Sequence, residues 1–343
     1  MNGYIDYAVQ QVINLCNIPS PTGFTKRVQN YLVEEFVNLG YKPVLTNKGS
    51  VLVDLGGNGD VLVLAAHVDT LGAMVRAIKD NGRIRISKIG GYPGNYIETE
   101  NCIVHTRTGK EYSGTIQLVN PAVHVNKDVS DTKRDDSNME VVLDEKVKSK
   151  EDVLKLEINT GDFISFDPRT VYTASGFIKS RHLDDKASAG ILIALAKYIK
   201  DTAPQLHRKV YLLFTTYEEV GHGGCSGLPD NVKEMISVDM GAVGDDLQAD
   251  EFKVSICAKD SQGPYDYDIT TRLIELAKKN NLNYAVDIYP YYGSDVDAAL
   301  SAGYDLKHGL IGPGVSASHG YERTHREGIG NTLSLLKEYV ESP

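Results

Sequence analysis

The stretch VYLLFTTYEEVG, which runs from Val210 to Gly221, determines the fold that we expect for the whole chain. Its first half, residues 210–215, is largely apolar and rich in β-forming residues, which is typical of a strand buried on both faces. Two adjacent carboxylates, Glu218 and Glu219, follow directly. They therefore lie where a strand ends, which is the edge that carries sites in open α/β sheets. A lone Glu-Glu pair is more often solvated surface, so other segments must support this interpretation.

Four other segments repeat the pattern, because each places a residue that can bind a metal just past an apolar run or at a helix start. These residues are His67, Asp184, Asp239 and His319. A parallel sheet brings the ends of its strands to one edge, so we expect all of them to meet Glu219 there. Imidazoles and carboxylates suit zinc, cobalt or manganese. Five ligands are too many for one catalytic zinc, but they suit two ions about 3.5–4 Å apart with one bridging carboxylate.

Each of these residues also has a structural interpretation. Asp184 and Asp185 could supply favourable negative charge at a helix N-terminus, and Asp239 could cap a turn. His67 could be an ordinary buried histidine. Asp69 favours the metal hypothesis for His67, because an acidic residue two positions on can hydrogen-bond the imidazole and fix its tautomer.

Composition and charge favour a globular protein that binds neither nucleic acid nor membrane. Among the 343 residues, 41% are hydrophobic and 24% are charged, and the net charge is -10. This negative charge disfavours nucleic acid and anionic membranes as partners. No apolar run approaches the roughly 20 residues of a membrane span, and the first residues do not resemble a signal peptide. Four scattered cysteines without a Cys-x-x-Cys pair indicate reduced thiols in a cytoplasmic protein.

The residues before the first metal motif predict two helices and two strands, of which the second is buried. Helical spacing of apolar residues covers 4–16 and 24–39. Two strands follow at 50–55 and 60–66, joined by a glycine-rich turn at 56–59. The second strand is continuously apolar and ends at the first metal motif.

Residues 72–168 have a different texture, with short β segments separated by glycine turns. This spacing predicts a small β-barrel or sandwich inserted into the α/β domain. We expect 127–145, which is strongly charged, to be an exposed loop. The expected strands are 74–78, 83–89, 102–106, 112–118, 155–158 and 162–166.

The α/β texture returns at Val171 and continues to the end of the chain. We expect a strand at 172–178, a strong helix at 187–199, and further strands and helices in alternation. This alternation predicts a mostly parallel sheet sandwiched by helices. The expected domains are therefore a catalytic α/β domain formed by 1–71 and 169–343, and an inserted β-rich domain formed by 72–168.

Five motifs occur in a specific order along nearly the whole chain. They are AAHVDTLG at 65–72, LDDK at 183–186, YEEVG at 217–221, VD at 238–239 and SH at 318–319. This ordered set resembles the dinuclear-metal aminopeptidases that include glutamyl aminopeptidase and the tetrahedral aminopeptidases. Two positions depart from the family's usual pattern: Thr70 replaces an acidic residue, and Gly320 follows His319 where the family often has serine.

The resemblance implies a zinc-peptidase-like fold, two metal ions and a role for each site residue. One metal would be held by His67 and Asp239 and the other by Glu219 and His319, with Asp184 bridging them. In the same way, Glu218 would be the general base.

The resemblance also implies that Asp69 orients His67 without binding a metal. The family's inserted domain is a dimerisation domain, so a homo-oligomer is implied, either a dimer or a dodecamer built from dimers.

We therefore expect a metal-dependent aminopeptidase that removes N-terminal residues from short peptides. Its cofactors would be two divalent ions, zinc or cobalt, with manganese as a further option. A deacylase or carboxypeptidase could use the same site. A glycosidase would leave the histidines without a role, and a non-enzymatic scaffold protein would be expected to have lost some of the five ligands. The loops that contain Tyr289, Tyr291, Tyr292 and Asp295 could line a substrate pocket or be ordinary packing.

Overall fold

Strand β3 (Val61–His67) lies inside a nine-stranded sheet and delivers the first metal motif at its end. The computed structural model describes residues 1–343. The strand order is β1-β2-β12-β3-β13-β17-β15-β16, with β14 beside β17. The other strands are β1 (Val44–Leu45), β2 (Val51–Gly56), β12 (Lys209–Thr215), β13 (Val232–Val238), β14 (Gly241–Ala242), β15 (Val254–Lys259), β16 (Tyr284–Ile288) and β17 (Lys307–Val315).

The centre of this sheet is parallel, as predicted. Strands β12, β3, β13 and β17 run parallel to their neighbours in that series, and β15 runs parallel to β16. Antiparallel pairs join β1 to β2, β2 to β12 and β15 to β17. The carboxyl ends of the four central strands therefore meet at one edge.

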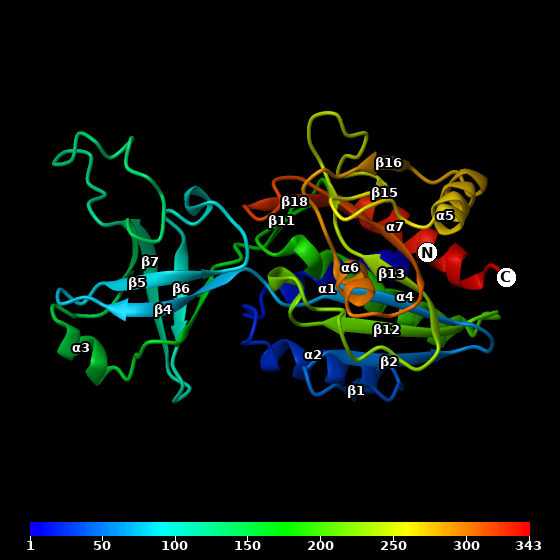
Figure 1. Cartoon of the computed structure of the whole chain (residues 1–343), viewed down its shortest axis with the longest axis horizontal. Helices are drawn as coiled ribbons and strands as arrows, with labels where there is room; N and C mark the ends of the chain where they lie inside the picture. The colour runs from blue at the N-terminus through cyan, green and yellow to red at the C-terminus, as the bar shows by residue number, and fades with distance from the viewer. The chain divides into compact units, whose positions relative to one another are not determined.

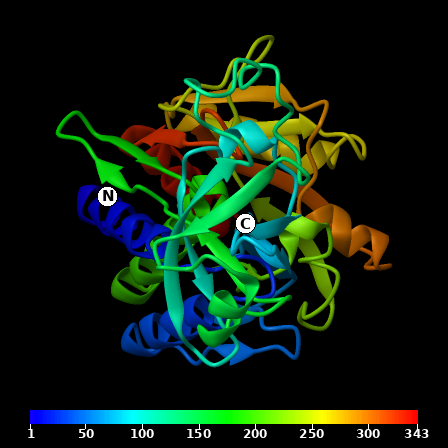
Figure 2. The same cartoon turned by 90° about the vertical axis from the view of Figure 1, so that its left-hand side faces the viewer.

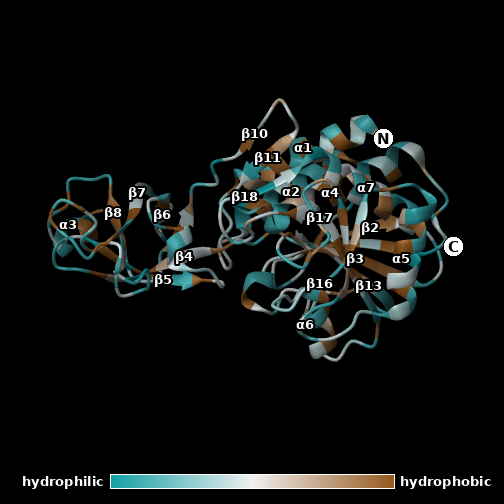
Figure 3. Cartoon of the chain, turned by 90° about the horizontal axis from the view of Figure 1, so that it is seen from above, coloured by the Kyte–Doolittle hydropathy of each residue, from teal (hydrophilic) through white to brown (hydrophobic).

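The continuous apolar run of β3 is explained by burial on both of its faces. Leu62, Leu64 and Ala66 belong to one hydrophobic core, whereas the alternating residues Val63 and Ala65 belong to a second core on the opposite face. This follows from the two-residue period of a strand. The central strands of this unit are accordingly hydrophobic in Figure 3.

Helices cover both faces of the sheet (Figure 1). The larger core contains residues of α1 (Asn2–Cys16), α2 (Lys26–Asn38), α4 (Leu183–Thr202), α5 (Tyr267–Lys279) and α7 (Arg326–Glu341). The smaller core contains residues of α6 (Asp295–Ser301). The predicted α/β fold with a sheet sandwiched by helices is therefore confirmed.

The two strands joined by the glycine turn are not neighbours in the sheet, because β12 lies between them. The glycines explain how the connection passes the start of β12. A Cβ atom at Gly57 would lie 1.9 Å from the carbonyl oxygen of Arg208, and one at Gly59 would lie 2.7 Å from that of His207. Both glycines also have positive φ angles of 85° and 112°. Only glycine combines this conformation with so close a backbone approach.

The expected single strand at 172–178 is instead a hairpin. It forms β10 (Val171–Tyr172) and β11 (Phe177–Ser180), and β11 pairs with β18 (Glu322–His325) in a three-stranded sheet. The turn closes through the N–H of Gly176, which donates to the carbonyl of Thr173. Pairing of β11 with β18 brings the segment after His319 next to the start of α4.

The second compact unit of the chain comprises Thr70–Pro168, and the first comprises Met1–Asp69 with Arg169–Pro343. The second unit contains a closed barrel in the order β4-β5-β8-β7-β6-β9, which confirms the predicted small barrel. Its strands are coloured from cyan to green in Figure 2. The strands are β4 (Gly72–Ile78), β5 (Ile84–Ile89), β6 (Asn101–His105), β7 (Glu111–Leu118), β8 (Met139–Leu143) and β9 (Phe163–Phe166).

Two local expectations for this unit are wrong. The charged segment 127–145 contains β8, because Met139, Val141 and Leu143 alternate into the barrel core while charged neighbours mask this pattern. Residues 155–158 do not form a strand, since α3 (Lys150–Lys155) ends there. The Ser149 side chain caps this helix by accepting the N–H of Asp152, which is a common helix start.

None of the helices has the length and apolar character needed to cross a membrane.

Close packing between α1 and α4 depends on Gly190. A Cβ atom there would lie 2.6 Å from Val12 Cγ2 and 2.9 Å from the Val12 nitrogen. We predict that Gly190→Ala lowers stability by about 1–3 kcal/mol through overpacking, although alanine favours helices. Thermal unfolding measures this change. Gly3→Ala is the matched control, since nothing lies within 4 Å of its Cβ position, and we expect a gain of about 0.4–1 kcal/mol. Equal shifts for the two variants would contradict this packing argument.

Candidate metal centre

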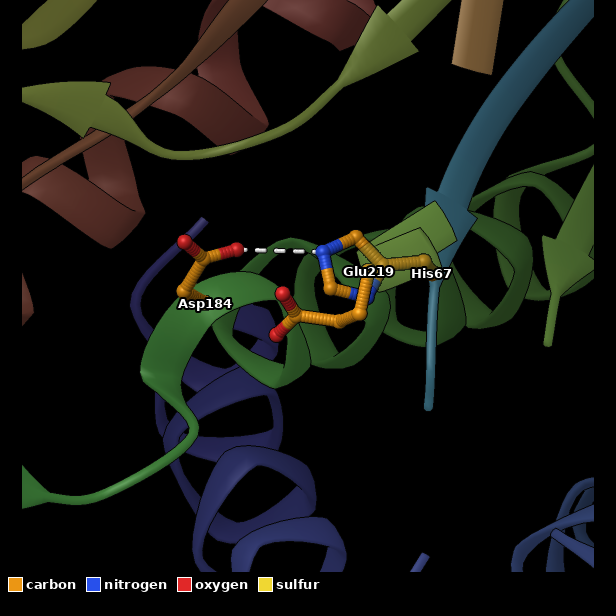
Figure 4. Close-up of side chains that lie close together, drawn as sticks. All are labelled: His67, Asp184 and Glu219. Carbon is orange, nitrogen blue, oxygen red and sulfur yellow. Dashed lines mark hydrogen bonds and ion pairs between the residues drawn. The ribbon is translucent and has the colours of Figure 1, made fainter. Parts of the chain in front are cut away.

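The five predicted ligands come from five separate segments at the carboxyl edge of the sheet. His67 is the last residue of β3, and Asp239 directly follows β13. Glu219 lies in a 3₁₀ turn, Glu218–Val220, that follows β12. Asp184 lies at the start of α4, and His319 follows β17. Figure 4 shows His67, Asp184 and Glu219 gathered together, with a contact between the first two.

Asp184 lies between the two histidines and contacts each through a different oxygen. Its Oδ1 atom is 3.0 Å from His67 Nε2, and its Oδ2 atom is 3.3 Å from His319 Nε2. The same nitrogen of His319 is 3.7 Å from Glu219 Oε2. The carboxylate of Asp184 thus connects the two histidines.

Asp239 joins this cluster on the side of His67. The potential ligand atoms of His67, Asp185 and Asp239 all lie within 4.8 Å of one another, as do those of His67, Asp184 and Glu219. The Asp239 carboxylate is fixed by Ser294 Oγ, which donates to Oδ2 at 2.6 Å, and by the N–H of Met240. The structure therefore brings all five predicted ligands together.

Asp185 is a site residue that sequence reasoning considered only as helix-terminal charge. Its side chain is fully buried, and its Oδ2 atom accepts the backbone N–H of His67 at 3.3 Å. Asp184 and Asp185 both have non-helical backbone angles. In the sequence, only its place beside Asp184 in the LDDK motif points to a role at the site. That place does not tell which of the two carboxylates would bind a metal.

Asp69 contacts both His67 and the glutamate turn. His67 Nδ1 lies 3.0 Å from the backbone oxygen of Asp69 and 3.6 Å from its carboxylate. The carboxylate instead accepts the backbone N–H groups of Glu218 and Glu219 at 3.2 and 3.4 Å, and the hydroxyl of Thr22 at 2.6 Å. The backbone oxygen of Asp69 therefore makes the closest contact with the imidazole of His67. The side chain of Asp69 fixes the turn that carries both glutamates.

The two glutamates of this turn differ in exposure. The side chain of Glu219 is 3% exposed, whereas that of Glu218 is 16% exposed and lies 3.6 Å from His67 Nε2. Glu218 therefore borders the cluster and is the more exposed of the two glutamates.

The glycine-rich segment after the turn packs directly against α6. A Cβ atom at Gly223 would lie 2.1 Å from Asp295 Oδ1, and one at Gly224 would lie 2.3 Å from the backbone oxygen of Asp295. Asp295 is 2% exposed and accepts the hydroxyl of Thr215 at the end of β12. Because these two glycines lack a side chain, Asp295 at the start of α6 can pack directly against the segment that follows the glutamate turn.

The tyrosines of the neighbouring loop have different environments. Tyr289 is buried and hydrogen-bonded to Ser255, and the Tyr292 hydroxyl donates to the backbone oxygen of Met240 at 2.8 Å. Tyr291 is 96% exposed. Tyr289 and Tyr292 therefore belong to the packing beneath the site.

The buried carboxylates are electrostatically costly without a cation. Burial, with repulsion from Asp184, raises the pKa of Glu219 to about 8 and that of Asp239 to about 6. Burial also raises the pKa of Glu218 well above its usual range. Although burial acts against it, hydrogen bonds from His319 and His67 hold the pKa of Asp184 below its usual range. Divalent cations would offset the burial and repulsion that raise these values.

Comparison with known proteins gives a family match over most of the chain. The family model of M42 glutamyl aminopeptidase matches residues 49–335. A putative aminopeptidase, YhfE, of Bacillus subtilis is 47% identical over 337 residues, which cover 98% of this chain and 97% of the relative.

Two solved structures share the fold. The TET1 peptidase of Pyrococcus horikoshii, which can assemble into a tetrahedron or a large octahedral shell, has a TM-score of 0.86 and 22% identity, with 98% of this chain and 100% of that chain covered. A TET aminopeptidase from a marine sediment thaumarchaeon has a TM-score of 0.88 and 18% identity, with 97% and 96% covered. At these identities, the two structures support the fold alone.

The family match and the Bacillus relative confirm the resemblance that the five ordered motifs indicate. The chain therefore belongs to the M42 glutamyl aminopeptidase family and is a hydrolase that acts on peptides.

Proposed function

We propose that the chain is a metal-dependent aminopeptidase that removes N-terminal residues from short peptides with the help of two divalent ions. His67 and Asp239 would hold one ion, and Glu219 and His319 would hold the other, while Asp184 would contact both. The observation that carries this proposal is the position of Asp184, whose two oxygens face different histidines at 3.0 and 3.3 Å. A carboxylate placed in this way is suited to bridge two cations.

The donor set fits zinc or cobalt, and it also accepts manganese. It combines two imidazoles with three carboxylates and contains no thiolate. These groups are largely buried, so each carboxylate gains from a nearby positive charge. When bound, the two ions would polarise the carbonyl of the first peptide bond, lower the pKa of a water and hold the free amino group.

Glu218 would act as the general base. Its carboxylate would take a proton from the water that attacks the peptide carbonyl and pass it to the departing amine. Its partial exposure beside His67 supports this role, because substrate and water can reach it. Asp69 would position Glu218 and Glu219 by accepting their backbone N–H groups, and would orient His67 through its own carbonyl.

We further propose that the chain forms a homo-oligomer in which the barrel unit supplies a dimer contact. The assembly of the structurally similar TET1 peptidase supports this proposal. Sedimentation of the whole chain and of a variant with charged residues added to the barrel surface would test it.

The four free cysteines support a reducing compartment such as the cytoplasm.

Replacement of the general base should separate metal binding from catalysis. We predict that Glu218→Gln keeps two ions per chain but lowers kcat by about 10²–10⁴-fold, because general base action typically contributes that much. Elemental analysis and peptide hydrolysis measure the two quantities. Glu275→Gln, at an exposed position of α5, is the control and should change neither. Turnover near that of the unchanged chain would show that Glu218 is not the base.

The free amino group of the substrate provides the direct test of the aminopeptidase proposal. We predict that the chain, loaded with zinc or cobalt, shortens a peptide from its free N-terminus and leaves the N-acetylated form intact. Mass spectrometry of the products over time measures this preference. Equal cleavage of both forms would instead favour a carboxypeptidase, and release of the acetyl group from the N-acetylated form would favour a deacylase on the same site.

A further inference from the structure

Glu322 connects the two sides of the metal centre through a pair of hydrogen bonds. It is the first residue of β18, and it is 1% exposed. Its Oε2 atom accepts the backbone N–H of Asp184 at 3.0 Å, and its Oε1 atom accepts the backbone N–H of His319 at 2.8 Å. One buried carboxylate thus ties together the main chains of two ligand residues that are far apart in the sequence.

The backbone conformation at His319 depends on its hydrogen bond to Glu322. His319 has a φ angle of 66°, which is in the left-handed region that non-glycine residues seldom adopt. Residues held in that region persist only when their surroundings impose it. The N–H of His319 donates to the side chain of Glu322, three residues later. This hydrogen bond closes the loop of residues 319–322 at the residue that carries the imidazole.

Strand pairing places Glu322 where it can also reach Asp184. In the antiparallel ladder of β11 and β18, Glu322 pairs with Ser180. The chain then continues from Ser180 into α4, so the Glu322 carboxylate faces the Asp184 N–H at the start of that helix. Glu322 therefore sets the position of Asp184 relative to His319.

The residues that would hold only the other ion are fixed by different groups, whereas Asp184 would contact both ions. The N–H of His67 donates to Asp185, and its Nδ1 atom contacts the backbone oxygen of Asp69. Asp239 is fixed by Ser294 and by the N–H of Met240. No contact of Glu322 with His67 or Asp239 is needed to hold them.

We propose that Glu322 is a positioning residue that sets the geometry of the ion held by Glu219 and His319. This inference rests on the proposed two-metal function. It goes beyond that function because binding of one ion would depend more strongly on the Glu322 side chain than binding of the other. Removal of either hydrogen bond would loosen the link between Asp184 and His319. The contacts of His67 with Asp69 and Asp185, and those of Asp239 with Ser294 and Met240, would persist.

The test is metal binding to Glu322→Gln. An amide has nearly the shape of the carboxylate, but only one of its terminal atoms can accept an N–H, so one of the two hydrogen bonds is lost. The control is Glu251→Gln. Glu251 accepts the hydroxyl of Ser316 at 2.7 Å and lies 3.3 Å from Arg323 Nε, so it lies near β18 without touching a proposed ligand.

We expect metal-free Glu322→Gln, titrated with zinc in a calorimeter, to bind one ion as the unchanged chain does and the second about 10–100-fold more weakly. The control should bind both ions normally. Peptide hydrolysis should then require more zinc for half-maximal activity, with kcat recovering at saturating zinc.

Failure of the Glu322 proposal and failure of the two-metal proposal give different binding results. Unchanged binding of both ions, or equal weakening of both, would overturn the role of Glu322. If the unchanged chain itself bound fewer than two ions, the proposed function would fail instead. If Glu322→Gln does not fold, Glu322→Asp replaces it, since its shorter carboxylate cannot reach both N–H groups in the same geometry. We expect the same selective weakening, and normal binding of both ions by this variant would overturn the proposal.

Discussion

The mutual repulsion of buried carboxylates at one sheet edge is the constraint on which the rest of the site depends. Asp184 repels both Glu219 and Asp239, all three carboxylates lie largely out of water, and burial raises the pKa of Glu219 and Asp239. Such a cluster is stable only with positive partners. The two histidines contact Asp184 in the structure, and two divalent ions would supply positive charge to the cluster. Metal binding and folding of the site are therefore expected to be linked.

The chain holds this unfavourable cluster in place mainly by hydrogen bonds from the main chain. Asp69 fixes the glutamate turn by accepting two backbone N–H groups, and Glu322 does the same for the segments of Asp184 and His319. Beneath them, the parallel strands β3, β12 and β13 are buried on both faces and give the ligands a rigid base.

The parts that could be predicted from the sequence are those with a local pattern. Buried strands are visible as apolar runs, and the ligands stand out because each follows such a run or starts a helix. The position of β12 between β2 and β3 has no such pattern, since sheet order depends on pairing between distant segments. The role of Glu322 is equally hidden, because its partners are backbone groups elsewhere in the chain. Strand β8 was masked by charged neighbours within the same segment.

Diffraction at the zinc absorption edge from zinc-soaked crystals tests the central claim of two ions bridged by Asp184 most directly. We expect two anomalous peaks about 3.5–4 Å apart, with Asp184 contacting both. One peak should adjoin His67 and Asp239, and the other should adjoin Glu219 and His319. A single peak, or two peaks of which neither contacts Asp184, would contradict the proposed metal centre.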